Sequence, residues 1–241
     1  MKRALAAAAM VAVAVPMLVA VSALPRPGAP DGPVHTQVAA RYLAAGAAET
    51  GAPNLVTGVL LGYRSFDTFG EVMIIFTALA AVMAALPATG ADGAADRQPA
   101  GGGLPAIRVS PLVAFVVRFT SPFIAAFALW VILKGHLFPG GGFQGGAILG
   151  ALGILLTIVL DRRRVWPLPA VARSRLLQAG GPLAFAVVAL AGLWLTGYVL
   201  GYPADPALHA VRSLMMLLLE VGIGFGGGAI ILALFLRLRG D

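Results

Sequence analysis

Long apolar stretches divide this chain, and shorter polar or glycine-rich segments separate them. A membrane-spanning helix needs about 20 apolar residues to cross a hydrocarbon core of roughly 30 Å. Each stretch of about this length therefore predicts one transmembrane helix. The stretches that qualify are residues 4–24, 69–86, 111–133, 143–160, 182–200 and 214–236.

The composition indicates the same class. Hydrophobic residues make up 59% of the chain, charged residues make up 11%, and the mean hydropathy is +0.92. Soluble domains contain about 45–50% apolar and about 25% charged residues. We therefore expect an all-α integral membrane protein of about six transmembrane helices. Because the chain has no cysteine, disulfides, iron–sulfur clusters and thiol catalysis are excluded.

The first apolar stretch has two interpretations. Lys2 and Arg3 precede it, and the small residues Val21-Ser22-Ala23 near its end fit a cleavable secretory signal. The stretch is also long enough to span the bilayer, and Pro16 would kink such a helix without preventing it. We expect the stretch to be retained as a membrane helix.

Two polar segments divide the chain into modules. Residues 25–53 are rich in proline, glycine and alanine, and a short amphipathic helix is expected at 36–50. Residues 88–109 are a low-complexity linker. We therefore expect a two-helix module over residues 1–87, a flexible cytoplasmic linker over 88–109 and a four-helix module over 110–241.

Basic residues are distributed unevenly between the two ends of the predicted helices. If the N-terminus is cytoplasmic, eleven Lys and Arg residues fall on the inner side and five on the outer side, with Arg118 inside a helix. This is the positive-inside bias, so we expect both termini in the cytoplasm. The net charge of +7 then reflects topology, and we expect no nucleic-acid partner.

Charge, aromatic residues, proline and glycine meet in residues 134–146, between the third and fourth stretches. Pro139 lacks an amide donor, and the three glycines after it permit a sharp reversal. Gly142, Gly146 and Gly150 are spaced by four, which lets another helix approach closely in lipid. The letters also match the dinucleotide pattern G-x-G-x-x-G, which we reject because membrane helices flank it in place of a βαβ unit.

Glu220 lies well inside the sixth stretch, on a face that also carries Gly224. A carboxylate at this depth is costly unless it is paired, protonated or in contact with water, so its default interpretation is functional. We take Glu220 as the first candidate for an ion path. The alternative is a buried, protonated acid that bonds to a neighbouring helix.

Three other ionisable residues are weaker candidates for the ion path. Glu71 and Thr68 fit a capping box at the start of the second helix, which explains both residues without transport. Lys134 and His136 either line a polar entry for protons or cations, or lie at the headgroup level.

The segments Arg118-Phe-Thr-Ser-Pro-Phe123, 134–146 and Glu220-Val-Gly resemble the B subunit of multisubunit Mrp-type sodium/proton antiporters. The resemblance covers roughly residues 108–239. Lys134 departs from the family pattern, in which we expect an apolar residue or histidine. The family's hallmark is carried by Pro139, Gly140, Gly141, Gly142, Phe143, Gly145 and Gly146.

The first half carries a second resemblance. Gly51-Ala-Pro-Asn-Leu-Val-Thr and Tyr63-Arg-Ser-Phe-Asp-Thr-Phe-Gly-Glu71 are similar to the C-terminal region of the antiporter A subunit, which stands alone as the small E subunit of membrane-bound hydrogenases. The chain therefore resembles a fusion of two neighbouring subunits. The shared core consists of Arg64, Asp67, Thr68, Gly70 and Glu71.

The resemblance implies an accessory, non-enzymatic subunit of a complex related to respiratory complex I, in a bacterial inner membrane. Its partners would be large antiporter-like subunits, small membrane subunits and the lipid bilayer, and the transported ions would be Na⁺ and H⁺. The subunit would help to hold the complex together and to form the ion path, without a cofactor or metal. The ion-path candidates are Glu220, Glu71, His136 and Lys134.

Other interpretations remain. The same subunit could serve a membrane-bound hydrogenase or another complex-I-like machine. An autonomous six-helix transporter should show an internal repeat and discontinuous helices, and the two halves show no convincing repeat. An intramembrane enzyme is disfavoured because the chain has no H-E-x-x-H motif, and its histidines, His35, His136 and His209, are scattered.

Overall fold

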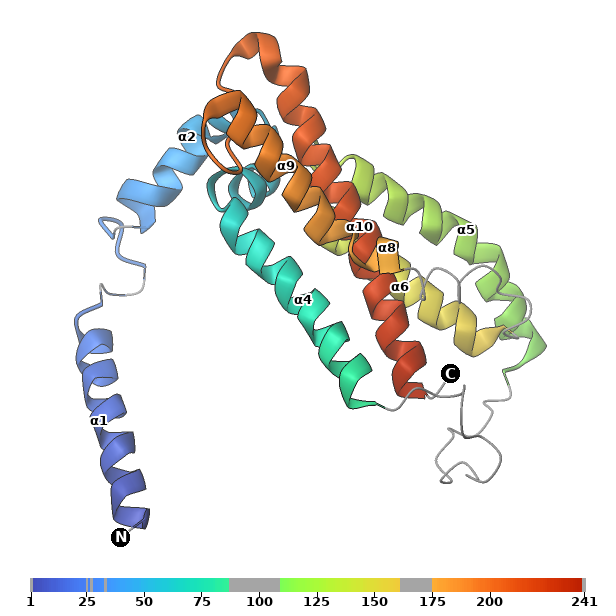
Figure 1. Cartoon of the computed structure of the whole chain (residues 1–241), viewed down its shortest axis with the longest axis horizontal. Helices are drawn as coiled ribbons and strands as arrows, with labels where there is room; N and C mark the ends of the chain where they lie inside the picture. The colour runs from blue at the N-terminus through green and yellow to red at the C-terminus, as the bar shows by residue number, and fades with distance from the viewer. Residues whose placement is uncertain are drawn as a thin grey trace. The chain divides into compact units, whose positions relative to one another are not determined.

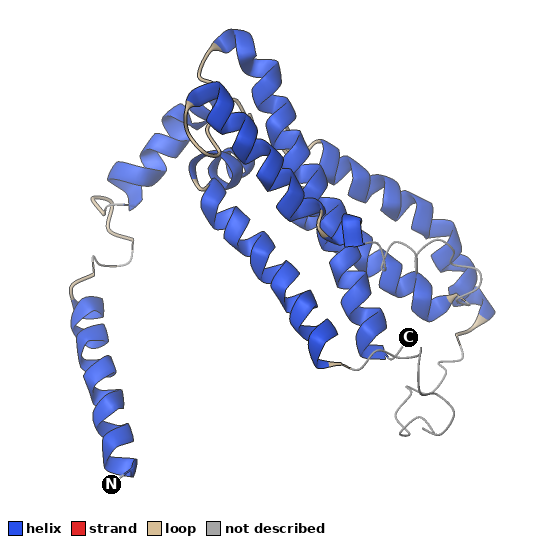
Figure 2. Cartoon of the chain, in the orientation of Figure 1, coloured by secondary structure: helices blue, strands red, loops and turns tan. Residues whose placement is uncertain are grey.

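The computed structural model describes residues 2–24, 26, 28–32, 34–86, 109–160 and 175–239. Within these ranges all regular secondary structure is helical, as Figure 2 shows, which confirms the expected all-α class. The expected linker at 88–109 lies almost entirely outside the described residues. The chain forms two compact units, residues 1–44 and 45–241.

Five described helices are long and apolar enough to cross a membrane: α1 (Lys2–Ser22), α4 (Ser65–Ala85), α5 (Pro111–Leu133), α6 (Gly142–Val159) and α10 (His209–Arg239). The fifth apolar stretch forms α9 (Gly180–Thr196), which has only 17 residues. This helix ends four residues before the predicted end, because Gly197 adopts a left-handed conformation with φ of 78° and closes it.

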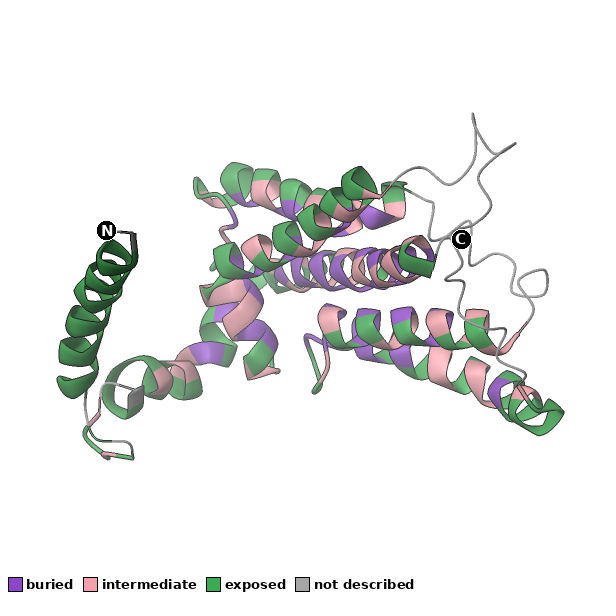
Figure 3. Cartoon of the chain, turned by 90° about the horizontal axis from the view of Figure 1, so that it is seen from below, coloured by how far each residue is buried: buried purple, intermediate pink, exposed green. Residues whose placement is uncertain are grey.

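The first unit contains α1, the π-helical turn η1 (Val34–Val38) and the start of α2 (Ala39–Thr50). The described side chains of α1 are exposed along its whole length, as the green helix beside the N label in Figure 3 shows. An apolar helix with no packed face is suited to lipid or to another membrane chain. The amphipathic helix expected at 36–50 is present as the end of η1 and α2.

The second unit is organised around α10, which packs against α4, α5, α6, α9 and the short helix α8 (Arg175–Gln178). Figure 1 shows α10 running through the middle of this group. The face of α6 that carries Gly142, Gly146 and Gly150 packs against α10. The helix that the glycine spacing predicted to approach α6 is therefore α10. A β-carbon at Gly146 would lie 2.6 Å from the carbonyl oxygen of Gly224, so glycine permits backbone contact there.

Two arginines of α10 bind the ends of other helices. The Arg212 guanidinium donates to the carbonyl oxygen of Glu49 at 3.2 Å, in the last turn of α2. Arg237 donates to the carbonyl oxygen of Leu86 at 2.8 Å, where α4 ends. The last carbonyls of a helix lack partners within the helix and carry its negative dipole end, so both arginines satisfy a helix terminus.

The capping box predicted at Thr68 and Glu71 is wrong. The chain enters α4 through the π-helix η2 (Gly58–Tyr63), so α4 begins at Ser65 and Thr68 lies inside it. The Thr68 hydroxyl donates to the carbonyl oxygen of Leu60 at 2.8 Å, and no hydrogen bond from an orphan amide to this hydroxyl is found among the described residues. Hydroxyl groups of the first turn of α4 therefore satisfy carbonyls of the π-helix before it.

The helix α5 continues through Ser121 and Pro122 without a break. Pro122 cannot donate to the carbonyl oxygen of Arg118, four residues earlier. The Ser121 hydroxyl donates to that oxygen at 3.1 Å. A side chain thus replaces the backbone bond that proline removes, as membrane helices require.

The close contact between α6 and α10 predicts a difference between two glycine substitutions. Gly146→Ala places a β-carbon against the backbone of Gly224 and should lower stability by roughly 1–3 kcal/mol through overpacking. Gly227→Ala is the matched control, because its β-carbon would meet nothing within 4 Å. Thermal unfolding in mild detergent should show a lower midpoint for the first variant only. Equal midpoints would contradict close packing at this position.

Candidate functional site

The carboxylate of Glu220 is buried in the second unit, with 4% of the residue exposed. Its Oε2 accepts a hydrogen bond from the backbone amide of Gly142, the first residue of α6. Its Oε1 lies 3.2 Å from the Thr57 hydroxyl. The first amides of a helix lack partners within the helix and carry its positive dipole end. Glu220 therefore caps α6 from a neighbouring helix.

The glycines of the turn before α6 allow Glu220 to approach. A β-carbon at Gly135 would lie 3.0 Å from Oε1, and one at Gly141 would lie 3.3 Å from Oε2. A β-carbon at Gly142 would lie 2.5 Å from the carbonyl oxygen of Glu220. Larger residues at these positions would push α10 away from the turn. The glycine cluster thus serves two needs, the chain reversal and the contact with the acid.

The segment before η2 holds the same turn from the other side. The Asn54 side-chain amide donates to the carbonyl oxygens of Gly135 at 2.6 Å and Phe138 at 2.9 Å. The backbone amide of Asn54 donates to the carbonyl oxygen of His136 at 3.3 Å. Asn54 also caps the short helix α3 (Leu55–Thr57) by accepting from the Val56 amide at 3.1 Å. One side chain thus joins residues 54–57 to the 134–141 turn.

A cavity of about 20 Å³ borders the Glu220 carboxylate. A cavity needs roughly 10–15 Å³ to hold one water molecule, so this space is water-sized. The polar residues of its lining include Thr57, Gln144 and Glu220. The complete lining consists of Thr57, Leu60, Leu61, Thr68, Gly140, Gly141, Gly142, Phe143, Gln144, Glu220 and Ile223.

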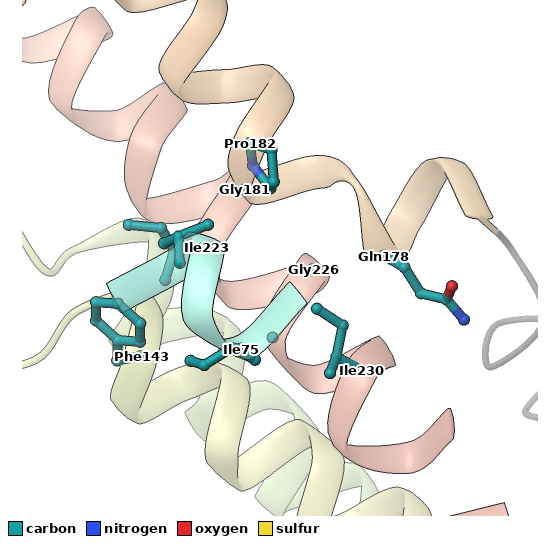
Figure 4. A pocket seen from close by; sticks show the side chains of 10 residues that line it. Ile75, Phe143, Gln178, Gly181, Pro182, Ile223, Gly226 and Ile230 are labelled. Carbon is teal, nitrogen blue, oxygen red and sulfur yellow. The ribbon is translucent and has the colours of Figure 1, made fainter. Parts of the chain in front are cut away.

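A second cavity, shown in Figure 4, lies beside the same part of α10 and is almost entirely apolar. It is about 10 Å³ in size and is lined from α4, α6, α8, α9 and α10, with Gln178 as the one polar side chain in its lining. Phe143 and Ile223 line both cavities. The apolar cavity is at the lower limit for one water and offers few polar partners.

Tyr202 brings a phenol close to the site from the loop between α9 and α10. Burial raises the pKa of Tyr202 above its usual value of 10.0. The nearby Ser65 hydroxyl acts on this pKa in the opposite direction, and the charge of Glu220 adds a smaller rise. Tyr202 therefore keeps its proton at neutral pH and presents a neutral hydroxyl near the acid.

His136 is buried in the turn before α6, with 8% of the residue exposed. Burial lowers the pKa of His136 below its usual value of 6.5, and the charge of Lys134 lowers it further. Its Nδ1 has no hydrogen-bond partner within the described part of the chain. His136 is therefore neutral at pH 7 and can still accept a proton. Lys134 itself is exposed at the end of α5.

Four of the other predicted site residues do not line the Glu220 cavity. Glu71 is exposed on α4 and does not line the Glu220 cavity. Asp67 is exposed and pairs with Arg64 at 2.5 Å. Pro139 is exposed in the turn. Gly145 packs on α5, because its β-carbon would lie 2.8 Å from the carbonyl oxygen of Ala128.

Three residues around Glu220 and the turn before α6 were not singled out from the sequence: Asn54, Thr57 and Tyr202. All three are polar residues near the ends of short segments, where such residues are common. The N-cap preference of Asn54 was a detectable local signal. Its bonds to Gly135 and Phe138 were not detectable, since they join positions more than 80 residues apart.

These features define a multi-pass membrane subunit in which a buried carboxylate caps a glycine-rich helix at a water-sized cavity. Residues 112–237 match a family described as a domain related to the MnhB subunit of Na⁺/H⁺ antiporters. The match covers more than half of the chain, so the chain belongs to this family, which confirms the predicted resemblance to the antiporter B subunit.

Similar proteins extend the likeness beyond the family region. A probable K⁺/H⁺ antiporter A/B subunit of Rhizobium meliloti is 27% identical over 206 residues, which is 76% of this chain and 19% of that protein. A chain of the Mrp complex from a Dietzia species matches 100% of this chain over 26% of its own length, at 26% identity and a TM-score of 0.63.

A third match is a chain of an archaeal respiratory membrane complex, the membrane-bound sulfane sulfur reductase. It is 25% identical, with a TM-score of 0.60, over 95% of this chain and 96% of that chain. By contrast, this chain spans less than two thirds of the length of the first curated relatives that it matches. The shared region is therefore one part of several larger membrane systems.

The buried histidine predicts a pH-dependent stability. Because folding lowers the pKa of His136 from 6.5, the unfolded chain binds more protons below that pH, and the free energy of unfolding should fall as the pH drops. Thermal unfolding in detergent between about pH 8 and about pH 5 measures this fall. His136→Gln should reduce the fall, whereas His209→Gln, at the exposed start of α10, should retain it. Identical pH dependence in both variants would show that His136 is not the group responsible.

Proposed function

We propose that this chain is an accessory, non-enzymatic subunit of a multisubunit monovalent cation/proton antiporter in a bacterial inner membrane. Membership of the MnhB-related family and similarity to a chain of an Mrp complex along the whole length support this proposal. Its partners are large antiporter-like subunits and small membrane subunits, and the transported ions are Na⁺ and H⁺. The exposed apolar helix α1 and the exposed apolar side chains of α5 offer surfaces for lipid or for these partners.

The observation that carries an ion-path role is the placement of Glu220. Its carboxylate is buried, touches a water-sized cavity and contacts only neutral hydrogen-bond donors in the described part of the chain. An intramembrane acid next to space for water has the chemistry to take up and release a proton. Glu220 therefore exchanges protons within the complex. His136, in the adjacent turn, is the next group that can accept a proton.

Exposed Glu71 and Lys134 have a different role in this proposal. Both face away from the core of their unit, so any contribution to the ion path requires another subunit opposite them. Glu71 lies in the second turn of the candidate membrane span α4, and a carboxylate that faced lipid there would be costly. A cationic or hydrated partner surface at this point would remove that cost.

The proposed orientation places both termini in the cytoplasm and the 134–141 turn at the outer face. The excess of basic residues on the inner side supports this arrangement. The helix α5 enters the turn and α6 leaves it, while α4 and α10 begin at the same end of the second unit (Figure 1). The Glu220 cavity then lies toward the outer side of the membrane.

A second function is supported by the likeness to a chain of the sulfane sulfur reductase complex, which this chain matches over nearly its full length. In that case the same subunit serves a redox-driven respiratory machine. The architecture of the subunit is compatible both with an ion gradient as the driving force of an antiporter and with a redox reaction as the driving force of a respiratory complex. The difference lies in which soluble and membrane partners assemble with it.

Purification of the tagged chain from its native membrane in mild detergent, followed by mass spectrometry, tests whether it works as part of a complex. We expect large antiporter-like subunits without redox proteins. Metal-cluster proteins in the same particle would transfer the assignment to a respiratory complex. Recovery of the chain alone as a stable, homogeneous species would contradict both and favour an autonomous transporter.

Replacement of Glu220 tests its role in transport. Glu220→Gln keeps the shape of the side chain and removes the exchangeable proton, so cation-dependent proton movement in membrane vesicles should fall by tenfold or more, on the order of 1.4 kcal/mol in the rate barrier. The yield of assembled complex is measured in parallel. Glu71→Gln, on the exposed face of α4, is the comparison variant. Unchanged transport with normal assembly of Glu220→Gln would refute the ion-path role.

A further inference from the structure

We propose that Thr57 is a positioning residue for Glu220 whose hydroxyl rotates to match the protonation state of the acid, while Asn54 holds the turn that makes this possible. The proposal rests on the proposed proton exchange at Glu220 and names residues outside the family region, 112–237, that take part in it. Residues 54–57 therefore complete a site whose acid and glycine turn lie in the second half of the chain.

The count of donors and acceptors around Thr57 carries the argument. Its oxygen accepts from the Asn54 side-chain amide at 3.2 Å. Its one hydrogen has two acceptors in reach, the Gly135 carbonyl oxygen at 2.9 Å and Glu220 Oε1 at 3.2 Å. A single hydrogen can serve only one of them at full strength. The hydroxyl therefore has two orientations, one toward the turn and one toward the acid.

Asn54 allows the turn to tolerate both orientations. Its side-chain amide donates to the Gly135 carbonyl oxygen at 2.6 Å and to the Phe138 carbonyl oxygen at 2.9 Å. Gly135 thus keeps one donor when the Thr57 hydroxyl rotates away. A buried carbonyl that lost its last donor would destabilise the turn, and Asn54 prevents that loss.

Each protonation state of Glu220 then has a complete set of bonds. When the acid is ionised, Thr57 donates to Oε1 and the Gly142 amide donates to Oε2. When Oε1 carries a proton, it donates to the Thr57 oxygen, and Thr57 donates to Gly135. In the uptake step a hydronium ion in the cavity gives a proton to Oε1 and leaves one water molecule. Release is the reverse reaction, in which Oε1 returns its proton to a water molecule in the cavity. Atoms and charge balance in both directions.

Glu220 is the one titratable residue among the described residues that line its cavity. The described helices α6 and α9, which pack on α10, contain no charged residue. Tyr202 keeps its proton, and Arg212, two turns earlier on α10, is bonded to the end of α2. His136 and Lys134 lie in the adjacent turn, and Asp67 and Glu71 of α4 are exposed. Arg118, in the first half of α5, and Arg175 of α8 are also exposed.

Infrared titration of the purified complex tests the proposal without measuring transport. The carbonyl stretch of protonated Glu220 is assigned as the band that Glu220→Gln removes. Thr57→Val deletes a hydrogen bond to a charged group, which is stronger than one to a neutral acid, so the midpoint of this band should move to higher pH by about one unit or more. Thr57→Ser restores the hydroxyl and should titrate like the native complex.

Matched controls separate this effect from a loss of structure. Thr157→Val removes a hydroxyl whose hydrogen bond among the described residues lies within α6, to the Ile154 carbonyl oxygen, and should leave the midpoint unchanged. If Thr57→Val does not assemble, Thr57→Ala provides the same test with a smaller side chain. A midpoint equal to the native one in the assembled variant would overturn the proposal, and so would the absence of any band that Glu220→Gln removes. A shifted midpoint together with normal transport in Glu220→Gln would retain the Thr57 inference and refute the ion-path role.

Discussion

The contact between the Glu220 carboxylate and the first amide of α6 is the interaction on which the second unit depends. Inside a membrane, water cannot satisfy the open amides at a helix start or the oxygens of a carboxylate. Here each group satisfies the other, with Thr57 as the second donor to the acid. The contact requires α10 to lie against the backbone of the turn. This close contact explains why positions 135, 141 and 142 are glycine.

The same principle extends along α10. Arg212 and Arg237 bind the carbonyls at the ends of α2 and α4, while Glu220 binds the amide at the start of α6. Each charge lies at the helix end of opposite dipole sign. One long helix therefore closes the ends of three others. Its small residues then permit the close backbone packing that replaces the hydrophobic effect between helices in lipid.

This arrangement also joins the two halves of the chain into one site. Asn54 and Thr57 precede α4, whereas the turn and Glu220 belong to the MnhB-related region. A fusion of two neighbouring subunits would keep such contacts within one polypeptide. The acid that exchanges a proton in our proposal is thus held by residues inside and outside the MnhB-related region. Function at this position depends on their packing.

The sequence by itself determined the membrane class, the all-α fold and the positions of the apolar helices, because each of these follows from local hydropathy and helix length. It also singled out Glu220 and the glycine turn, since a lone intramembrane acid and a glycine cluster are conspicuous in apolar surroundings. It failed at Thr68, where local spacing suggested a cap but the preceding π-helix carried the chain into α4 earlier. Only the tertiary structure decided that α10 covers the glycine face of α6, that Asn54 and Thr57 reach the turn, and that Glu71 and Glu220 have different surroundings. Those facts depend on contacts between distant segments, which no local pattern of residues encodes.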